Sequence, residues 1–327
     1  MRRSLNNGGV VVIGELNVDM VATGLTGPPR MGAEITAADF ELTLGSASAI
    51  FACGVAKLGH KVTFISRVGR DDFGEFCLKA LRAARVPTDN VLIDKRVKTG
   101  VTVSLSTRTD RALVTYPGAI ASFNYGQLKL VQLRGQRHLH MTSYFLQDGL
   151  RPSFPQIFRE ARRMGLTTSF DPNSDPEQAW GGGINDVLAE TDVLFLNETE
   201  ARQLTGARNV RGALKILGQS VSCAVVKLGP EGAVAIKGGE VTSAPGFKVE
   251  ALDTTGAGDC FAAGFVSTYL RGRSLAECLR AGNACGALST LKAGGTAGQP
   301  DARSLKAFLK TQDDGSTLKH TAPRGHR

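Results

Sequence analysis

Short apolar runs alternate along the chain with segments in which apolar residues recur at helical spacing. The apolar runs are rich in β-branched residues and end in glycine or polar residues, as buried strands of a parallel sheet do. The expected strands cover 10–14, 61–69, 166–170, 192–197 and 223–229. The expected helices cover 46–59, 71–86, 152–165, 198–205 and 208–218. Strand and helix in alternation predict an α/β fold whose central, mostly parallel sheet is flanked by helices.

Three segments depart from this pattern. Residues 99–119 alternate polar and apolar positions around a turn near Thr109–Asp110, which predicts a hairpin with one covered face. Residues 24–45 are loop and strand in character. These two insertions predict a small β appendage that serves as a lid or a dimerisation surface. Residues 311–327 are polar and aperiodic, so we expect a disordered tail there.

Composition limits the class of protein but not its partner. With 42% hydrophobic and 21% charged residues, the chain is typical of a soluble globular protein. The net charge of +9 is spread without a block of about five basic residues, so dispersed surface charge fits better than nucleic-acid binding, and an anionic small substrate fits equally well. The six cysteines form no C-x-x-C pair. No secretory signal or bilayer-length apolar stretch is visible, and we expect a reduced, cytoplasmic protein.

Polar residues follow several of the expected strands, at the end of a parallel sheet where ligands gather. Asn17 and Asp19 follow the first of these strands, Asn197 ends the fourth with Glu200 just after it, and Lys227 lies in the fifth. Each of these residues also fits a helix cap or a solvated turn. None of them indicates a site by itself.

The stretch "DTTGAGDCFAAGF" at 253–265 carries more specific chemistry. Glycines let backbone N–H groups approach a ligand, and a helix N-terminus aims several such groups at one point. Residues Thr255 to Gly258 therefore form a candidate anion cradle. Asp259 beside it either stabilises the helix dipole or takes a proton. A phosphate cradle with an adjacent base is what phosphoryl transfer to a hydroxyl requires, with the other polar loops holding the alcohol and Mg²⁺.

The same stretch closely resembles the second signature of the ribokinase-like (PfkB) carbohydrate kinases, with order and spacing intact through Gly264. The resemblance extends over nearly the whole chain. "GELNVD" resembles the family's sugar-binding first loop, "VGRDDFG" a loop after its third strand, "NETE" its N-x-x-E motif, and "KLGPEG" its K-x-G-x-x-G segment. It implies one ribokinase-like domain over 1–327, with a β lid from about 17–45 and 96–120. It also implies an ATP-dependent kinase that phosphorylates a hydroxymethyl oxygen of a sugar.

The resemblance carries site roles onto residues of this chain. Asp259 would be the catalytic base, beside an anion hole made by the amides of Gly256, Ala257, Gly258 and Asp259. The sugar site would contain Asn17, Asp19, Gly45, Ser46 and Ile50. The ATP site would contain Asn197, Lys227, Gly229, Gly232, Thr255 and Asn283. Glu200 and Asn197 would organise Mg²⁺ largely through water, while Asp253 and Thr255 would hold K⁺ with carbonyls near Gly294–Gly298.

Two positions depart from the family pattern. The first signature expects two glycines and then a substrate-contacting asparagine, but Ser46 replaces the second glycine and Ile50 the asparagine. Either Ile50 faces the pocket and the acceptor presents a less polar edge, or Ile50 packs in the core and Ser46 or Ser48 contacts the sugar. Asp175 stands where many fructokinase-like and keto-deoxy-gluconate-kinase-like members have arginine. We therefore expect a neutral sugar.

Other interpretations stay open at this point. A nucleoside kinase of the adenosine type would share the base and the lid. A non-catalytic sugar-binding paralogue is motivated only by Ile50, and the intact Asp259 motif argues against it. A dinucleotide-binding dehydrogenase is disfavoured because the first βα unit lacks G-x-G-x-x-G. We expect a homodimer formed through the lid, with no nucleic acid or membrane as partner.

Overall fold

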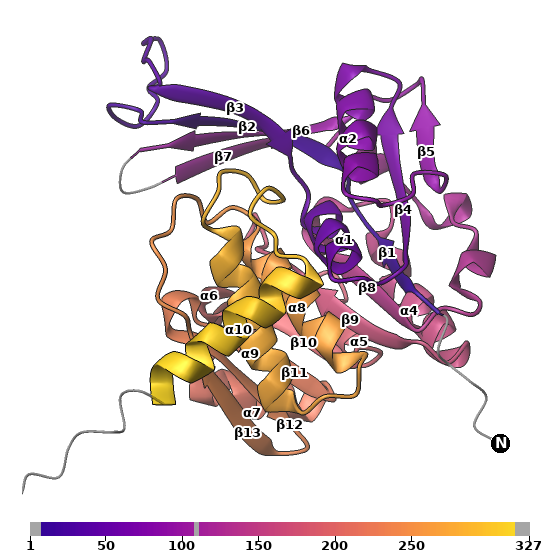
Figure 1. Ribbon diagram of the computed structural model, residues 1–327. Helices are drawn as coiled ribbons and strands as arrows, with labels where there is room; N and C mark the ends of the chain where they lie inside the picture. The colour runs from indigo at the N-terminus through magenta and orange to yellow at the C-terminus, as the bar shows by residue number, and fades with distance from the viewer. Residues whose placement is uncertain (1–7, 108–110, 318–327) are drawn as a thin grey trace, which may run out of the picture.

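A nine-stranded sheet forms the centre of the computed structural model, which describes residues 8–107 and 111–317 (Figure 1). Its strands are β1 (Val10–Ile13), β4 (Val62–Gly69), β5 (Val91–Asp94), β8 (His138–Thr142), β9 (Thr167–Asp171), β10 (Val193–Asn197), β11 (Cys223–Lys227), β12 (Gly232–Lys237) and β13 (Glu240–Pro245). The order is β13-β12-β11-β10-β9-β8-β1-β4-β5. Pairing is parallel from β11 to β5, whereas β12 and β13 are antiparallel.

Helices cover both faces of this sheet and make two apolar cores. The first face carries α1 (Ala47–Lys57), α2 (Asp72–Ala83), α8 (Ala257–Tyr269) and α9 (Leu275–Ser289). The second face carries α4 (Phe154–Arg163), α5 (Ile184–Leu188), α6 (Glu198–Thr205) and α7 (Val210–Ser220), while the short α3 (Ala119–Ser122) lies near β4. Strand β1 serves both cores, because Val10 and Val12 face one and Val11 and Ile13 the other. Such alternation explains why the strands are apolar throughout.

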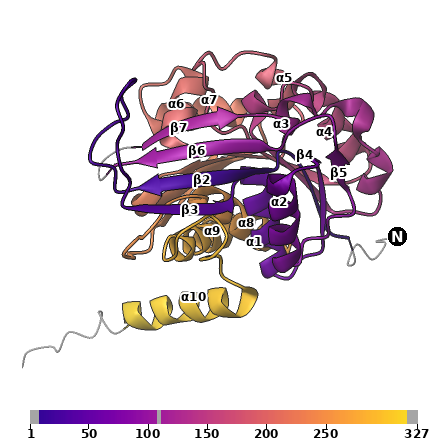
Figure 2. The ribbon, with the colours of Figure 1, turned by 90° about the horizontal axis from the view of Figure 1, so that it is seen from above.

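A second, four-stranded sheet projects from one end of the large sheet (Figure 1), and Figure 2 shows its strands side by side. Its strands are β2 (Asn17–Thr23), β3 (Asp39–Leu44), β6 (Gly100–Ser106) and β7 (Arg111–Tyr116), in the order β3-β2-β6-β7. The parallel pairing of β2 with β6 joins the two insertions into one sheet, called the lid below. The turn expected near Thr109–Asp110 lies outside the described residues. The predicted fold class, α/β with a small second sheet, is confirmed.

Residues 311–317 differ from the expectation of disorder, whereas residues 318–327, the rest of the expected tail, lie outside the described residues. Helix α10 runs from Ala302 to Thr317. Phe308 and Leu309 pack against a small buried cluster that includes Leu305, and Arg280 on α9 forms an ion pair with Asp313 at 2.6 Å. These contacts attach α10 to the body of the protein, and the helix continues through residues 311–317, which their composition did not predict. Within the described part of the chain, no helix has the length and apolar character needed to cross a membrane.

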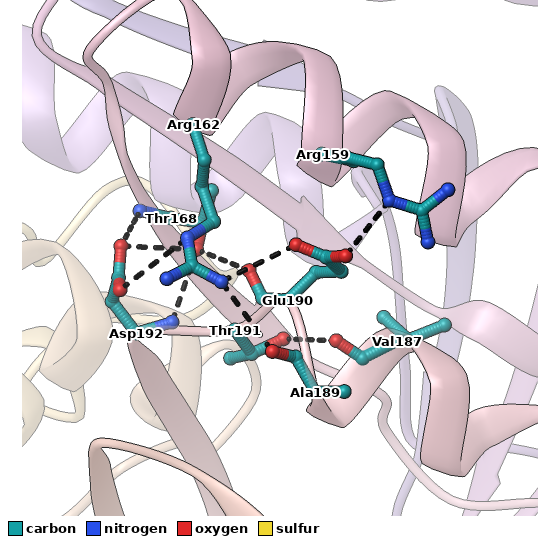
Figure 3. Close-up of polar contacts among 8 residues, drawn as sticks. All are labelled: Arg159, Arg162, Thr168, Val187, Ala189, Glu190, Thr191 and Asp192. Carbon is teal, nitrogen blue, oxygen red and sulfur yellow. Dashed lines mark hydrogen bonds and ion pairs between the residues drawn. The ribbon is translucent and has the colours of Figure 1, made fainter.

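A polar cluster fastens α4 to the beginning of β9 and β10 (Figure 3). Arg159 and Arg162 each donate to Glu190, at 2.9 and 3.2 Å. Asp192 accepts from the backbone N–H of Thr168 at 2.8 Å. Because the two arginines are well exposed, these ion pairs add little stability.

Helices α8 and α9 approach closely where glycine replaces a side chain. A Cβ at Gly264 would lie 2.6 Å from the Cys285 sulfur, and a Cβ at Gly282 would lie 2.8 Å from the Phe261 ring. Neither contact leaves room for a methyl group in a densely packed interior. The position of α8 is therefore fixed by α9.

We predict that Gly264→Ala lowers the free energy of unfolding by about 1–3 kcal/mol, because the added methyl overpacks this contact. Gly212→Ala is the matched control in α7, where an added Cβ would meet its neighbours at 3.4 and 3.5 Å, an ordinary contact. That variant should keep or raise stability, since alanine favours helix by up to about 1 kcal/mol. Denaturant unfolding of both variants checks this, and equal behaviour of the two would contradict it.

Candidate active site

Charged residues meet where the strands of the large sheet end. Glu15 follows β1, Asp171 ends β9, and Lys227 ends β11 beside Asn197 on β10. Helix α8 begins at the same edge, with Asp259 in its first turn. Parallel pairing brings these ends together although they are far apart in the sequence.

The loop before α8 has the shape of an anion cradle. Gly256 adopts φ 70°, a left-handed conformation that favours glycine, and it caps α8. Asp253 fixes the loop, because one carboxylate oxygen accepts from the Thr255 N–H and hydroxyl at 2.9 and 2.7 Å. The first helical turn leaves backbone N–H groups such as that of Gly258 free of helical partners.

The backbone N–H of Ala257, expected in the anion hole, has a partner within the turn. The N–H of Ala257 donates to the Thr254 carbonyl at 3.2 Å, within the turn itself. The amides of Gly256, Gly258 and Asp259 remain as the donors that this turn presents. The hole that the sequence predicts over 256–259 therefore has three such groups in the described conformation.

Asp259 carries a strongly altered acidity. Desolvation, the largest cause, raises the pKa of this partly buried carboxyl well above its usual range. The negative charges of Asp171, Glu15 and Glu200 raise it further, while Lys227 opposes them. A carboxylate with a raised pKa at the first turn of a helix is suited to accept a proton.

Lys227 and Asp171 form an ion pair with an Nζ–Oδ2 distance of 2.6 Å. Burial lowers the pKa of Lys227, but the charges of Asp171 and Glu200 outweigh it, so the net shift is upward. The lysine thus stays charged. Sequence reasoning gave no functional role to its partner Asp171, although an acid at the end of a buried strand was the signal.

A cavity of about 410 Å³ opens beside the cradle, a volume typical of small-ligand sites. Four of the residues expected at the ATP site line it, namely Lys227, Gly229, Gly232 and Asn283. Ala257 and Gly258 also line it, so the cavity meets the anion cradle. Thr255 and Asn197, by contrast, do not belong to its lining. The Asn283 amide group donates to the carbonyls of Ala244 and Pro245, both at 3.0 Å, which anchors one wall.

Asn197 and Glu200 bond each other at the start of α6. The Asn197 Oδ1 accepts from the Glu200 N–H, and Glu200 Oε2 accepts from the Asn197 N–H, both at 2.8 Å. Burial and the charge of Asp171 raise the pKa of Glu200. In the described ranges no cluster of three or more His, Cys, Asp or Glu side chains could hold a metal. These residues fit Mg²⁺ that keeps its waters and arrives with phosphates, rather than a protein cage.

On the lid side, Asn17 orients Asp19. The Asn17 Nδ2 donates to the Asp19 Oδ1 at 3.1 Å and to the Thr102 hydroxyl at 3.3 Å. A Cβ at Gly45 would overlap the Asp19 carboxylate, so residue 45 must be glycine for this arrangement. The structure thereby brings together three of the residues expected to hold the acceptor.

Ile50 packs into the protein. Its side chain is 3% exposed, and two of its carbons lie 3.0 Å from where a Gly256 Cβ would be. It also fills the space beside Gly295, so it packs against both the cradle loop and the loop that contains Gly295. Of the two expectations for this residue, the described conformation fits the one in which Ile50 belongs to the core.

The serines next to Ile50 bond Glu15 and not an open pocket. Ser46 donates to the Glu15 carbonyl at 2.6 Å, and Ser48 donates to its carboxylate at 2.9 Å. Thr142 and Ser143 donate to the same buried carboxylate. Sequence reasoning missed Glu15 as an organising residue, although an acid directly after a buried strand was its signal. Ser46 tolerates φ 77° here, and its hydroxyl also accepts from the Ala49 N–H.

Asp175, at the position where many family members have arginine, fixes the conformation of its own loop. Its carboxylate accepts from the backbone N–H groups of Glu177, Ala179 and Trp180, at 3.0, 2.8 and 2.7 Å. The side chain is buried and occupied by these bonds. It offers no positive charge to an acceptor.

Comparison with known proteins agrees with this geometry. The model of the pfkB family carbohydrate kinases matches residues 7–302. The 2-dehydro-3-deoxygluconokinase of Bacillus subtilis is 30% identical, over 84% of this chain and 88% of that protein. Fructokinase-2 of Zea mays is 30% identical, over 92% and 93%. The solved ribokinase of Arabidopsis thaliana, complexed with ribose and ATP, is 25% identical with a TM-score of 0.80, over 93% of this chain and 99% of that one. The chain therefore belongs to the pfkB family of carbohydrate kinases and is a phosphotransferase that acts on a sugar.

Proposed function

We propose that the protein transfers the γ-phosphoryl group of ATP to a hydroxymethyl oxygen of a neutral sugar. The observation that carries this proposal is the position of Asp259, a carboxyl of raised pKa at the start of α8, where the cradle meets the 410 Å³ cavity. The cavity is suited to the nucleotide, and the lid side to the acceptor. The solved Arabidopsis ribokinase, crystallised with ribose and ATP, supports the pairing of these two ligands.

In this mechanism Asp259 accepts the proton of the hydroxymethyl group as its oxygen attacks the γ-phosphorus. The bond from the γ-phosphorus to the bridging oxygen breaks, and ADP leaves with that oxygen. The amides of Gly256, Gly258 and Asp259 donate to the oxygens of the phosphoryl group, where charge is stabilised during transfer. Mg²⁺ bound with the phosphates would supply further charge neutralisation, and Glu200 and Asn197 would hold it through water.

The acceptor is a neutral sugar held by Asp19 and Asn17. Carboxylate and amide groups pair well with sugar hydroxyls. Asp175 provides no cation for an acid group. A screen of ATP-dependent ADP release with ribose, fructose, adenosine and inosine tests this function, and turnover of the nucleosides alone would identify a nucleoside kinase instead.

We also propose a K⁺ site at Asp253 and Thr255, with carbonyls of the loop Gly294–Gly298. Asp253 already accepts from the Gly294 N–H at 2.8 Å, so the carboxylate links the two loops. A cation there would fix the geometry of the cradle without joining the reaction. The same screen with K⁺ or tetramethylammonium as the monovalent cation, at matched ionic strength, tests this, and equal rates would refute it.

Among the variants and assembly that test the proposed function, the first prediction concerns Asp259→Asn. Turnover should fall ~10²–10⁴-fold, the usual contribution of a positioned base, while ATP binding persists. The folded state raises the pKa of Asp259, so the stabilisation that this carboxyl gives is complete below the unfolded pKa of about 3.9 and is lost as the pH rises through the folded pKa. At pH 7 the variant should therefore have a higher Tm than the wild type, with a smaller difference near about pH 4.

Exposed Asp186→Asn in α5 serves as the control and should change neither quantity. Steady-state kinetics and thermal unfolding across pH are the two measurements. A drop in kcat of less than about tenfold would mean that Asp259 only stabilises the helix N-terminus.

The second prediction concerns Ile50→Asn. The new amide would be buried against the cradle and would lack partners, which costs about 1–3 kcal/mol of stability. We expect a lower Tm and no gain in kcat/KM for ribose or fructose. Ile50→Val, which keeps the apolar contact, should cost only about 0.5–1.5 kcal/mol. A tenfold gain in kcat/KM with unchanged Tm would show that residue 50 faces the acceptor instead.

The third prediction concerns a homodimer formed through the lid. One face of the lid carries polar groups such as Asp19, while the other is an apolar surface across all four strands, here called the outer lid face. The register places on it Phe40, Ala22, Leu105 and Ala112 in one row and Leu42, Met20, Val103 and Val114 in the next. Phe40 and Val114 are 60% and 61% exposed in the single chain. A large exposed apolar patch of this kind marks an interaction surface.

We expect the mass in solution, measured by light scattering, to be that of two chains. Val114→Glu should give single chains, because it places a charge in the apolar contact. Ser104→Glu, on the polar face of the neighbouring strand β6, should leave the mass unchanged. A wild-type mass of one chain, 34.5 kDa, would exclude the dimer.

A further inference from the structure

Lys227 lines the proposed nucleotide cavity, and an ion pair with Asp171 holds its side chain in place. Its side chain is 15% exposed, and that of its partner Asp171 is 1% exposed. Strands β9 and β11 are not neighbours, since β10 lies between them, so the ion pair spans the width of one strand. Burying two charges costs more free energy than the pair usually returns. Such a pair needs an explanation beyond stability.

The ammonium group lies against the cradle. A Cβ at Gly258 would be 3.2 Å from the Lys227 Nζ. Lys227 lines the same cavity as Ala257 and Gly258, so its charge faces the region in which the backbone N–H groups of the cradle converge. A phosphoryl group bound by those amides would be within reach of the lysine.

The charges that act on the titration of Lys227 are negative. They belong to Asp171, Glu200 and Asp259. Phosphates brought into this cluster would be repelled by three carboxylates unless a cation stood among them. Lys227 is that cation on the protein itself.

We propose that Lys227 is a further catalytic residue, whose ammonium contacts the transferring phosphoryl group, and that Asp171 is the positioning residue that holds it there. The proposal rests on the proposed kinase function. The lysine keeps its proton throughout, and its contribution is to offset charge on the phosphoryl oxygens as the bond to the bridging oxygen breaks. Asp171 limits the freedom of a flexible side chain, so the charge is in place before the reaction.

A purely structural role predicts different behaviour. If the pair only joined β9 to β11, removing it would lower Tm but leave kcat of the folded enzyme unchanged. Under the proposal, kcat falls while nucleotide affinity changes little. The two roles are therefore separable by kinetics.

The experiment compares Lys227→Met, Asp171→Asn, the double variant and Lys215→Met, a control that removes an exposed lysine from α7. We expect kcat of Lys227→Met to fall ~10²–10³-fold, as when one donor to a developing oxyanion is removed. AMP-PNP affinity, measured by calorimetry, should change less than about tenfold. Asp171→Asn should lower kcat less, and the double variant should be no slower than Lys227→Met, because one residue acts through the other. Lys215→Met should behave as wild type.

A second readout does not depend on the acceptor. ADP with aluminium fluoride, which mimics a phosphoryl group in transfer, should raise the Tm of the wild type more than ADP alone. Lys227→Met should lose this extra shift and keep the shift given by ADP.

If no sugar supports ADP release by the wild type, the proposed function fails, while the aluminium fluoride shift still decides the role of Lys227. If Lys227→Met keeps both kcat and the extra shift, the inference is overturned and the pair is structural. A lower Tm with unchanged kcat would likewise overturn the inference.

Discussion

Four carboxylates, those of Glu15, Asp171, Glu200 and Asp259, lie at one edge of the sheet, and the site depends on how each is accommodated. Hydroxyl groups hold Glu15, the capping partner Asn197 holds Glu200, and Lys227 holds Asp171. Burial, together with the charges of the other three, raises the pKa of Asp259 well above its usual range. The other three carboxylates are bonded to neighbouring groups, and the raised pKa of Asp259 suits it to accept a proton.

Glu15 also bonds Ser46, one of the positions at which the chain departs from the family pattern. The hydroxyls of Ser46 and Ser48 bond this residue, so serine in the first signature serves the protein interior. The serines are occupied by these bonds, and Ile50 is buried beside Gly256 and Gly295. Under the proposed function, Asn17 and Asp19 on the lid would therefore carry much of the recognition of the acceptor.

The parallel sheet and the cradle could be predicted from the sequence because their causes are local. Val10 to Ile13 are apolar at every position, and the glycines before Asp259 precede a helical run. The direction of Ile50, the partners of Glu15 and the helical state of residues 311–317 could not be predicted this way. Each depends on groups distant in the sequence, such as Gly295 for Ile50 and Arg280 for α10. The pair of Lys227 with Asp171 likewise requires the order of β9, β10 and β11, which periodicity alone does not provide.

The tight contact of α8 with α9 has a consequence for how such an enzyme diversifies. Gly264 and Gly282 leave no space for even one added methyl group, so the helix that carries the cradle cannot shift to suit a different acceptor. The lid is a separate sheet whose edge strands are β3 and β7. Under the proposed function, changes that alter the choice of sugar would accumulate in the lid without disturbing the transfer chemistry. Selection would then act on substrate range and on catalytic power in different parts of the chain.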